Sequence, residues 1–150
     1  MMISRIAALV VLMLMVGGCA SEDILSRLQI ENKKIDGFTK HFAESRFLIT
    51  ENKHFGVELL MPDDKLTAPE DWMYLVIHDS ADRDVAGADL SVVARNPETG
   101  TTRQAGIRDE GGGLYRITGL RLGRGAGWEV TVKIMHQDKS DSVIFPASRN

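Results

Sequence analysis

Cysteine is almost absent from this sequence, which has one, Cys19, among 150 residues. A disulfide needs two thiols, so none can form within the chain. Aromatic residues are also few, with 2 Trp, 2 Tyr and 5 Phe. Stability must therefore come from an apolar core, which a domain of about 100 residues can supply without covalent cross-links.

The composition and motifs of the sequence indicate neither nucleic-acid binding nor catalysis. The 18 Lys and Arg face 21 Asp and Glu, whereas nucleic-acid-binding domains carry a basic patch or stripe. No Gly-x-Ser-x-Gly nucleophile elbow, His-Glu-x-x-His or paired-cysteine motif occurs. Asp79, Asp82, Asp84 and Asp89 lie close together, but their spacing is not that of a calcium loop, and Asp is common in turns. We therefore expect a protein that is not an enzyme and has no nucleic-acid partner.

A run of apolar residues long enough to span a bilayer is missing near the amino terminus. The apolar run from Ile6 to Val16 is shorter than the ~20 residues that a membrane-spanning helix needs. It follows Arg5 and leads into Gly17 and Gly18. A positive start, a short apolar run and then small residues are typical of a secretory signal peptide.

The residues that end this run carry a first resemblance. Val16-Gly17-Gly18-Cys19 resembles the lipobox of bacterial lipoproteins. The resemblance implies cleavage of residues 1–18 and covalent lipid on Cys19, and hence a protein anchored in the bacterial cell envelope and facing the periplasm. An ordinary signal peptide with a chance cysteine is the alternative, but a lone cysteine in an exported protein favours lipidation. Ala20 stands where an Asp resembles an inner-membrane retention signal, which favours the outer membrane in a cell that has one.

Removal of residues 1–18 leaves one domain and a tether. The remaining 132 residues carry 17 Lys and Arg, because Arg5 is lost, against 21 Asp and Glu, a formal net charge of −4. Residues 19–45 are expected to be the lipidated tether, in which Ser21 can cap a helix. A weak helical stripe follows, formed by Ile24, Leu25, Leu28 and Ile35. Asp36-Gly37 interrupts this pattern. We interpret the segment as a partly helical, solvated spacer; a helix that docks on a partner is the alternative.

From residue 46 the hydrophobic pattern becomes that of strands. Expected strands are Phe47–Thr50, Val57–Met61, Trp72–Asp79, Ala88–Arg95, Thr101–Arg108, Leu114–Ile117, Trp128–His136 and Asp141–Phe145. The third is rich in β-branched and aromatic residues, which predicts a central strand buried on both faces. In Trp128–His136 the apolar residues alternate with Glu129, Thr131 and Lys133, which predicts one buried face.

Short strands at regular spacing predict an all-β fold, an immunoglobulin-like antiparallel β-sandwich of 7–8 strands. The sandwich is expected to span residues 46–146, with a tail at 147–150. Trp72, Trp128 and Tyr115 are its expected structural core residues.

A second resemblance covers roughly residues 45–146. Asp79 followed by Val85-Ala86-Gly87-Ala88 looks like a hairpin of periplasmic immunoglobulin-like modules. Gly113-Leu114-Tyr115 and Gly127-Trp128-Glu129-Val130 are similar to signatures of the FixH/YtkA-like group. The resemblance implies an envelope-facing module, and some relatives are associated with copper handling and cytochrome oxidase assembly.

The copper implication meets a departure from the family pattern. Copper-handling relatives resemble one another in Met- and His-rich segments between these motifs, but Ala94 to Gly113 contains neither residue. Candidate ligands elsewhere are His78, His136, Met73 and Met135, which lie in two of the expected strands. Imidazole and thioether groups suit copper if they converge. The interpretation we favour is strand-end histidines and methionines that fill the core.

The sequence therefore predicts a lipid-anchored envelope protein that acts as a non-catalytic binding or assembly module for another envelope protein. The alternative is a copper-binding and delivery protein that serves cytochrome oxidase assembly. Convergence of the imidazoles of His78 and His136 would favour this alternative. Apart from copper and the lipid on Cys19, no cofactor is expected.

Overall fold

The computed structural model describes residues 29–61, 72–122 and 127–146, which form eleven strands and no helix. Within these ranges, nothing helical has the length and apolar character to cross a membrane. The predicted signal peptide, Cys19, the predicted helical stripe at 21–28 and the tail at 147–150 lie outside the described residues.

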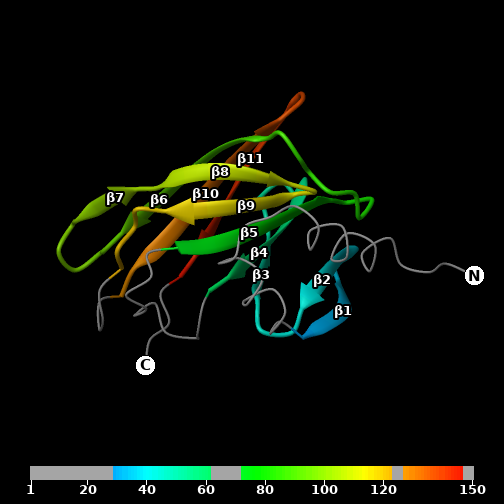
Figure 1. Ribbon diagram of the computed structural model, residues 1–150, viewed down its shortest axis with the longest axis horizontal. Helices are drawn as coiled ribbons and strands as arrows, with labels where there is room; N and C mark the ends of the chain where they lie inside the picture. Colours follow the sequence, from blue (N-terminus) through cyan, green and yellow to red (C-terminus); the bar gives the residue numbers. More distant parts are fainter. Residues whose placement is uncertain (1–28, 62–71, 123–126, 147–150) are drawn as a thin grey trace, which may run out of the picture.

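Nine of the strands form two antiparallel sheets that pack face to face (Figure 1). The five-stranded sheet has the order β3-β4-β5-β9-β8, with β3 at Arg46–Ile49, β4 at Phe55–Leu60, β5 at Trp72–Asp79, β9 at Leu114–Thr118 and β8 at Gly106–Gly111. The four-stranded sheet has the order β11-β10-β6-β7, with β11 at Lys139–Phe145, β10 at Glu129–His136, β6 at Asp89–Arg95 and β7 at Thr102–Gln104.

The strand order is that of an immunoglobulin-like sandwich. β4, β5, β9 and β8 correspond to strands A, B, E and D, and β11, β10, β6 and β7 to strands G, F, C and C′. β3 adds one strand beside β4. The predicted all-β sandwich is thus confirmed. One detail differs: the stretch that looks like a hairpin does not pair with itself, because β5 and β6 belong to different sheets.

The main core lies between the sheets and follows the predicted alternation. In β10, Val130, Val132 and Ile134 are buried, and they share one cluster with Leu75 and Ile77 of β5. Apolar side chains on one face of each sheet can leave water only by facing the other sheet, which holds the two layers together.

The three expected core residues have different outcomes. Trp128 and Tyr115 are buried in the main core, 4% and 1% exposed. The Tyr115 hydroxyl donates to the Val85 carbonyl at 2.7 Å and accepts from the Ala88 amide at 2.9 Å. Trp72 begins β5 opposite Thr118, and its side chain lies outside the described part.

The outer face of the five-stranded sheet is also covered. Tyr74 and Val76 of β5 form a second apolar cluster with Leu60 and Leu114, against which Phe42 packs. β5 is therefore buried on both faces, as its continuous apolar run predicts.

Phe42 belongs to a two-stranded hairpin, where the structure differs from the expected spacer. β1 at Ile30–Ile35 pairs with β2 at Phe38–Phe42. Asp36 and Gly37 have φ values of 47° and 88°, and positive φ at both central residues is what a two-residue type I′ turn requires. Residues 30–42 are thus part of the folded structure, and β2 lies against β4 (Figure 1).

The chain closes the sandwich along both edges. The predicted strand Thr101–Arg108 is divided at Ala105, because β7 pairs with β6 in one sheet and β8 with β9 in the other. At the opposite edge, the Glu51 amide donates to the Ser142 carbonyl of β11 at 3.0 Å. With the hairpin, this division raises the strand count above the predicted 7–8.

Candidate functional site

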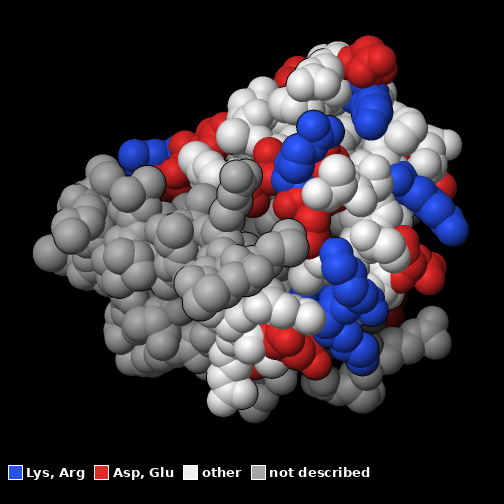
Figure 2. All heavy atoms as spheres, turned by 90° about the vertical axis from the view of Figure 1, so that its right-hand side faces the viewer, with Lys and Arg blue, Asp and Glu red and all other residues white. Residues whose placement is uncertain are grey.

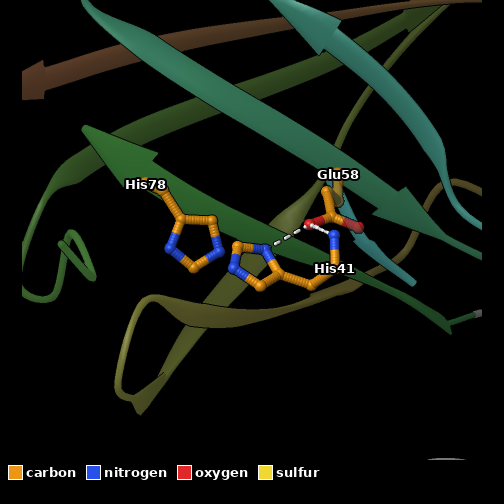
Figure 3. Close-up of side chains that lie close together, drawn as sticks. All are labelled: His41, Glu58 and His78. Atoms are coloured by element: carbon orange, nitrogen blue, oxygen red, sulfur yellow. Dashed lines mark hydrogen bonds and ion pairs between the residues drawn. The ribbon is translucent and has the colours of Figure 1, made fainter. Parts of the chain in front are cut away.

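Three titratable side chains from three strands meet between the hairpin and the five-stranded sheet. We call them the histidine–glutamate cluster. They are His41 of β2, Glu58 of β4 and His78 of β5 (Figure 3). They are 2%, 0% and 4% exposed. One potential ligand atom from each lies within 4.8 Å of the others.

Strand alternation places this cluster on the outer face of the five-stranded sheet. Val57 and Ile77 point into the main core, so the neighbouring Glu58 and His78 point the other way. Gly56 pairs with His78 and leaves room for the hairpin. A Cβ at Gly56 would lie 3.0 Å from the Phe38 ring of β2.

The carboxylate of Glu58 accepts four hydrogen bonds from the hairpin and the turn that follows it. Oε1 accepts from the His41 amide and from His41 Nδ1, both at 2.7 Å. Oε2 accepts from the Ser45 hydroxyl at 2.8 Å and the Phe42 amide at 3.1 Å. Burial raises the pKa of Glu58, but these hydrogen bonds outweigh burial and hold the pKa below its usual value. Glu58 is therefore ionised at neutral pH.

An ionised carboxylate fixes the tautomer of the neighbouring imidazole. Because the Glu58 carboxylate can only accept, His41 Nδ1 carries the proton in their shared hydrogen bond. In the neutral ring Nε2 then holds the lone pair, and it makes no hydrogen bond within the described residues. The ring centroids of His41 and His78 are 4.1 Å apart, and Figure 3 shows the second nitrogen of His41 turned toward the ring of His78.

His78 has a carboxylate neighbour of its own. Its Nδ1 lies 3.3 Å from Asp84 Oδ1, and an isolated backbone bridge joins the two residues. Neither ring nitrogen of His78 makes a hydrogen bond to the described part of the chain. Each histidine thus has a carboxylate near Nδ1, hydrogen-bonded in His41 but not in His78, and an Nε2 that makes no hydrogen bond within the described residues.

Two of the aspartates considered for calcium, Asp79 and Asp82, have other partners. Asp79 Oδ1 accepts from the amides of Ala81 and Arg83 within its own turn. Asp82 Oδ2 accepts from the Thr39 hydroxyl at 2.7 Å and from Lys34 Nζ at 3.1 Å. Asp82 thereby helps to hold the hairpin against the sheet.

The four residues considered for copper do not come together. His78 is on the outer face of one sheet, whereas His136 follows the inward-facing residues at the end of β10 in the other. Met73 is in the main core, five residues before His78, or about 16 Å away along the strand. Met135 is 52% exposed on the opposite face of β10 from His136. This set does not fit a copper ion.

His41 and Glu58 were not identified from the sequence. Their cluster depends on the hairpin, and one signal for the hairpin was present: Asp36-Gly37 between two short segments is typical of a type I′ turn. Glu58 gave a weaker signal, as a single acid within the apolar run Val57–Met61.

Comparisons with known proteins add little. No protein-family model matches the chain, and no curated protein matches it. A crystal structure of a DUF4785 family protein from Legionella pneumophila is similar over 65% of this chain and 29% of that protein, at 13% identity and a TM-score of 0.47. This chain thus spans under a third of that protein's length, and at such a TM-score the likeness says nothing further about fold or function.

Proposed function

We propose that this protein is a bacterial lipoprotein that serves as a non-catalytic binding or assembly module for another envelope protein. The lipobox at Val16–Cys19 supports anchoring through lipid on Cys19, in the envelope and facing the periplasm. Ala20, in place of an Asp that would resemble an inner-membrane retention signal, favours location in the outer membrane of a cell that has one. The resemblance to FixH/YtkA-like domains supports an envelope-facing module.

The observation that carries the non-catalytic role is the hydrogen bonding of Ser45. A serine, a histidine and an acid lie together here, as in hydrolases that use a catalytic triad. In a triad the serine donates to the histidine that will remove its proton, but the Ser45 hydroxyl contacts Glu58 Oε2 instead. Ser45 is also 7% exposed. The hydroxyl is therefore not paired with an imidazole as a triad requires, and a substrate has little access to it.

The surface charge is also in keeping with a protein partner. Figure 2 shows acidic and basic side chains interspersed over the described part of one face. Mixed charge of this kind differs from the basic stripe of nucleic-acid-binding proteins.

The test is to locate the protein in cells of a bacterium that processes lipoproteins. We expect the wild type in the membrane fraction, labelled by radioactive palmitate, and a Cys19→Ser variant without label and released from that fraction. Ser21→Ala is the matched control and should behave as the wild type. Cross-linking in intact membranes should then yield a discrete product with another envelope protein. Unlabelled wild type would contradict the proposal.

Metal handling is the second candidate function. The specific observation that favours it is the pair of buried imidazoles with nitrogens that lack hydrogen bonds, at His41 and His78. Copper is among the ions that imidazole suits. The ligands would differ from the predicted set, because His136, Met73 and Met135 lie elsewhere.

A further inference from the structure

The buried imidazoles of His41 and His78 are arranged as metal ligands usually are. A metal-bound histidine commonly donates its other ring N–H to a carboxylate or carbonyl, which fixes the ring and its tautomer. Glu58 Oε1 is 2.7 Å from Nδ1 of His41, and Asp84 Oδ1 is 3.3 Å from Nδ1 of His78. In each ring this leaves Nε2 as the nitrogen away from the carboxylate.

These two nitrogens are buried without partners. His41 Nε2 and His78 Nε2 make no hydrogen bond within the part of the chain described by the structure. Buried polar atoms in proteins nearly always have a hydrogen-bond partner. Two buried ring nitrogens without one, in neighbouring imidazoles, therefore need an explanation. A cation that accepts lone pairs from both rings would satisfy both atoms.

We infer that His41 and His78 bind, through their Nε2 atoms, a divalent transition-metal ion that prefers imidazole, of the class of Zn²⁺ and Cu²⁺. Glu58 and Asp84 position the two rings. This inference rests on the metal-handling candidate and adds its ligands and the class of ion.

The hydrogen bonding of Glu58 decides against a hard cation. Both of its oxygens accept two hydrogen bonds, from His41 and from Ser45 and Phe42. An sp² oxygen has two lone pairs, so these contacts occupy most of the acceptor sites that Ca²⁺ or Mg²⁺ would need. Nitrogen ligands remain, and these suit zinc, copper and nickel.

The distances require only small movements. Metal–nitrogen bonds of about 2.0–2.1 Å place two ligands of a tetrahedral ion about 3.3 Å apart. The potential ligand atoms of the cluster already lie within 4.8 Å of one another, and the ring centroids are 4.1 Å apart. A small adjustment of the two rings would bring both nitrogens to this spacing around one ion.

Binding would join two elements that are far apart in the sequence. His41 belongs to the hairpin and His78 to the central strand of the sheet. An ion between them would fasten the hairpin to the sandwich. Two protein nitrogens would leave coordination positions for water or for a donor from a partner protein.

The test is a titration of the full-length protein in detergent with Zn²⁺ and, separately, with Cu²⁺, against a chelator of known affinity. We expect one ion per chain. His41→Gln and His78→Gln should each weaken binding by about 100-fold or more, and Glu58→Gln by about 10–100-fold through loss of ring positioning. His136→Gln is the matched control and should bind as the wild type. Ca²⁺ should not compete.

A second measurement on the wild type avoids variants that fail to fold. Ring-nitrogen NMR of ¹⁵N-histidine protein should show Zn²⁺-dependent shifts at Nε2 of His41 and His78, and none at His54 or His136. Tight binding that shifts other histidines would overturn the assigned site but leave metal handling standing. No binding of either ion would overturn both. The palmitate labelling is independent of all these results.

Discussion

Asp141 joins the two sheets at the edge formed by β3 and β11. It is buried in β11 and accepts hydrogen bonds from the Thr50 hydroxyl at 2.6 Å and from the amides of Asn52 and His54 at 3.1 and 3.2 Å. Thr50, Asn52 and His54 lie between β3 and β4 of the other sheet. Burial raises the pKa of Asp141, but the hydrogen bonds outweigh it and hold the pKa below its usual value.

Replacing this acceptor should destabilise the whole domain. Asp141→Asn removes the negative charge and turns one acceptor into a donor that faces other donors. We expect the free energy of unfolding at pH 7 to fall by about 2–3 kcal/mol, measured by urea denaturation. The control is Asp138→Asn in the exposed turn after β10. This substitution should change the free energy of unfolding by less than about 0.5 kcal/mol.

The same residue gives a pH dependence with a definite sign. A carboxyl group with a lowered folded-state pKa stabilises the fold above its unfolded pKa of ~3.9, and this contribution is lost as pH falls through the folded value. The stability difference between wild type and Asp141→Asn should therefore shrink below about pH 4. An undiminished difference at pH 2 would show that the charge of Asp141 is not responsible.

At this scale the sequence predicted single residues better than their contacts. His78 was recognised as a candidate, and Trp128 and Tyr115 as core residues, because strand periodicity reports which face a side chain occupies. Partners are decided by which strands become neighbours. His78 meets His41, 37 positions earlier in the chain, only because the hairpin lies on β4, and no local pattern encodes that contact.

Among the elements, the β1–β2 hairpin depends on a close approach to the sheet. Phe38 of β2 sits over Gly56 of β4, where an added Cβ would lie 3.0 Å from the Phe38 ring and 3.1 Å from the Phe47 ring. Contacts this short force neighbours to move, and overpacking in proteins typically costs about 1–3 kcal/mol.

We expect Gly56→Ala to loosen the hairpin before the rest of the fold. Amides of β2, including that of His41, should exchange with solvent faster, while those of β10 keep their wild-type protection in hydrogen-exchange NMR. Gly106→Ala serves as the control, because its Cβ would make an equally short contact of 3.0 Å, but with the Thr118 hydroxyl of β9 and not with the hairpin. Equal acceleration in β2 and β10 would show that the hairpin has no separate stability.

Strands were predicted well where one hydrophobic pattern continued along the whole segment. β5 and β10 match their predicted ranges to within one residue, because a continuous apolar run and a strict alternation each fit one environment. The hairpin was mistaken for a spacer because β1 is mostly exposed and has little apolar pattern. The division at Ala105 was missed because a crossing between sheets needs no break in the alternation.

For the whole molecule, the closed edges predict cooperative unfolding. The sheets share one apolar core, are linked covalently through Ala105 at one edge and are hydrogen-bonded through Asp141 at the other. Neither sheet can keep its buried face without the other. Calorimetry of the full-length protein should give one transition with equal calorimetric and van't Hoff enthalpies. Two resolved transitions within the sandwich would contradict this.

The joined edges also bear on how copies of this protein meet. An open sheet edge exposes backbone donors and acceptors, which invites strand addition by another chain and, at high concentration, amyloid-like stacking. Here β7 runs directly into β8, and β3 lies against β11, so the edges of each sheet face those of the other. Charged side chains at Arg108, Asp109 and Glu110 occupy β8 as well. At high local concentration the protein is thereby protected from edge-to-edge polymerisation.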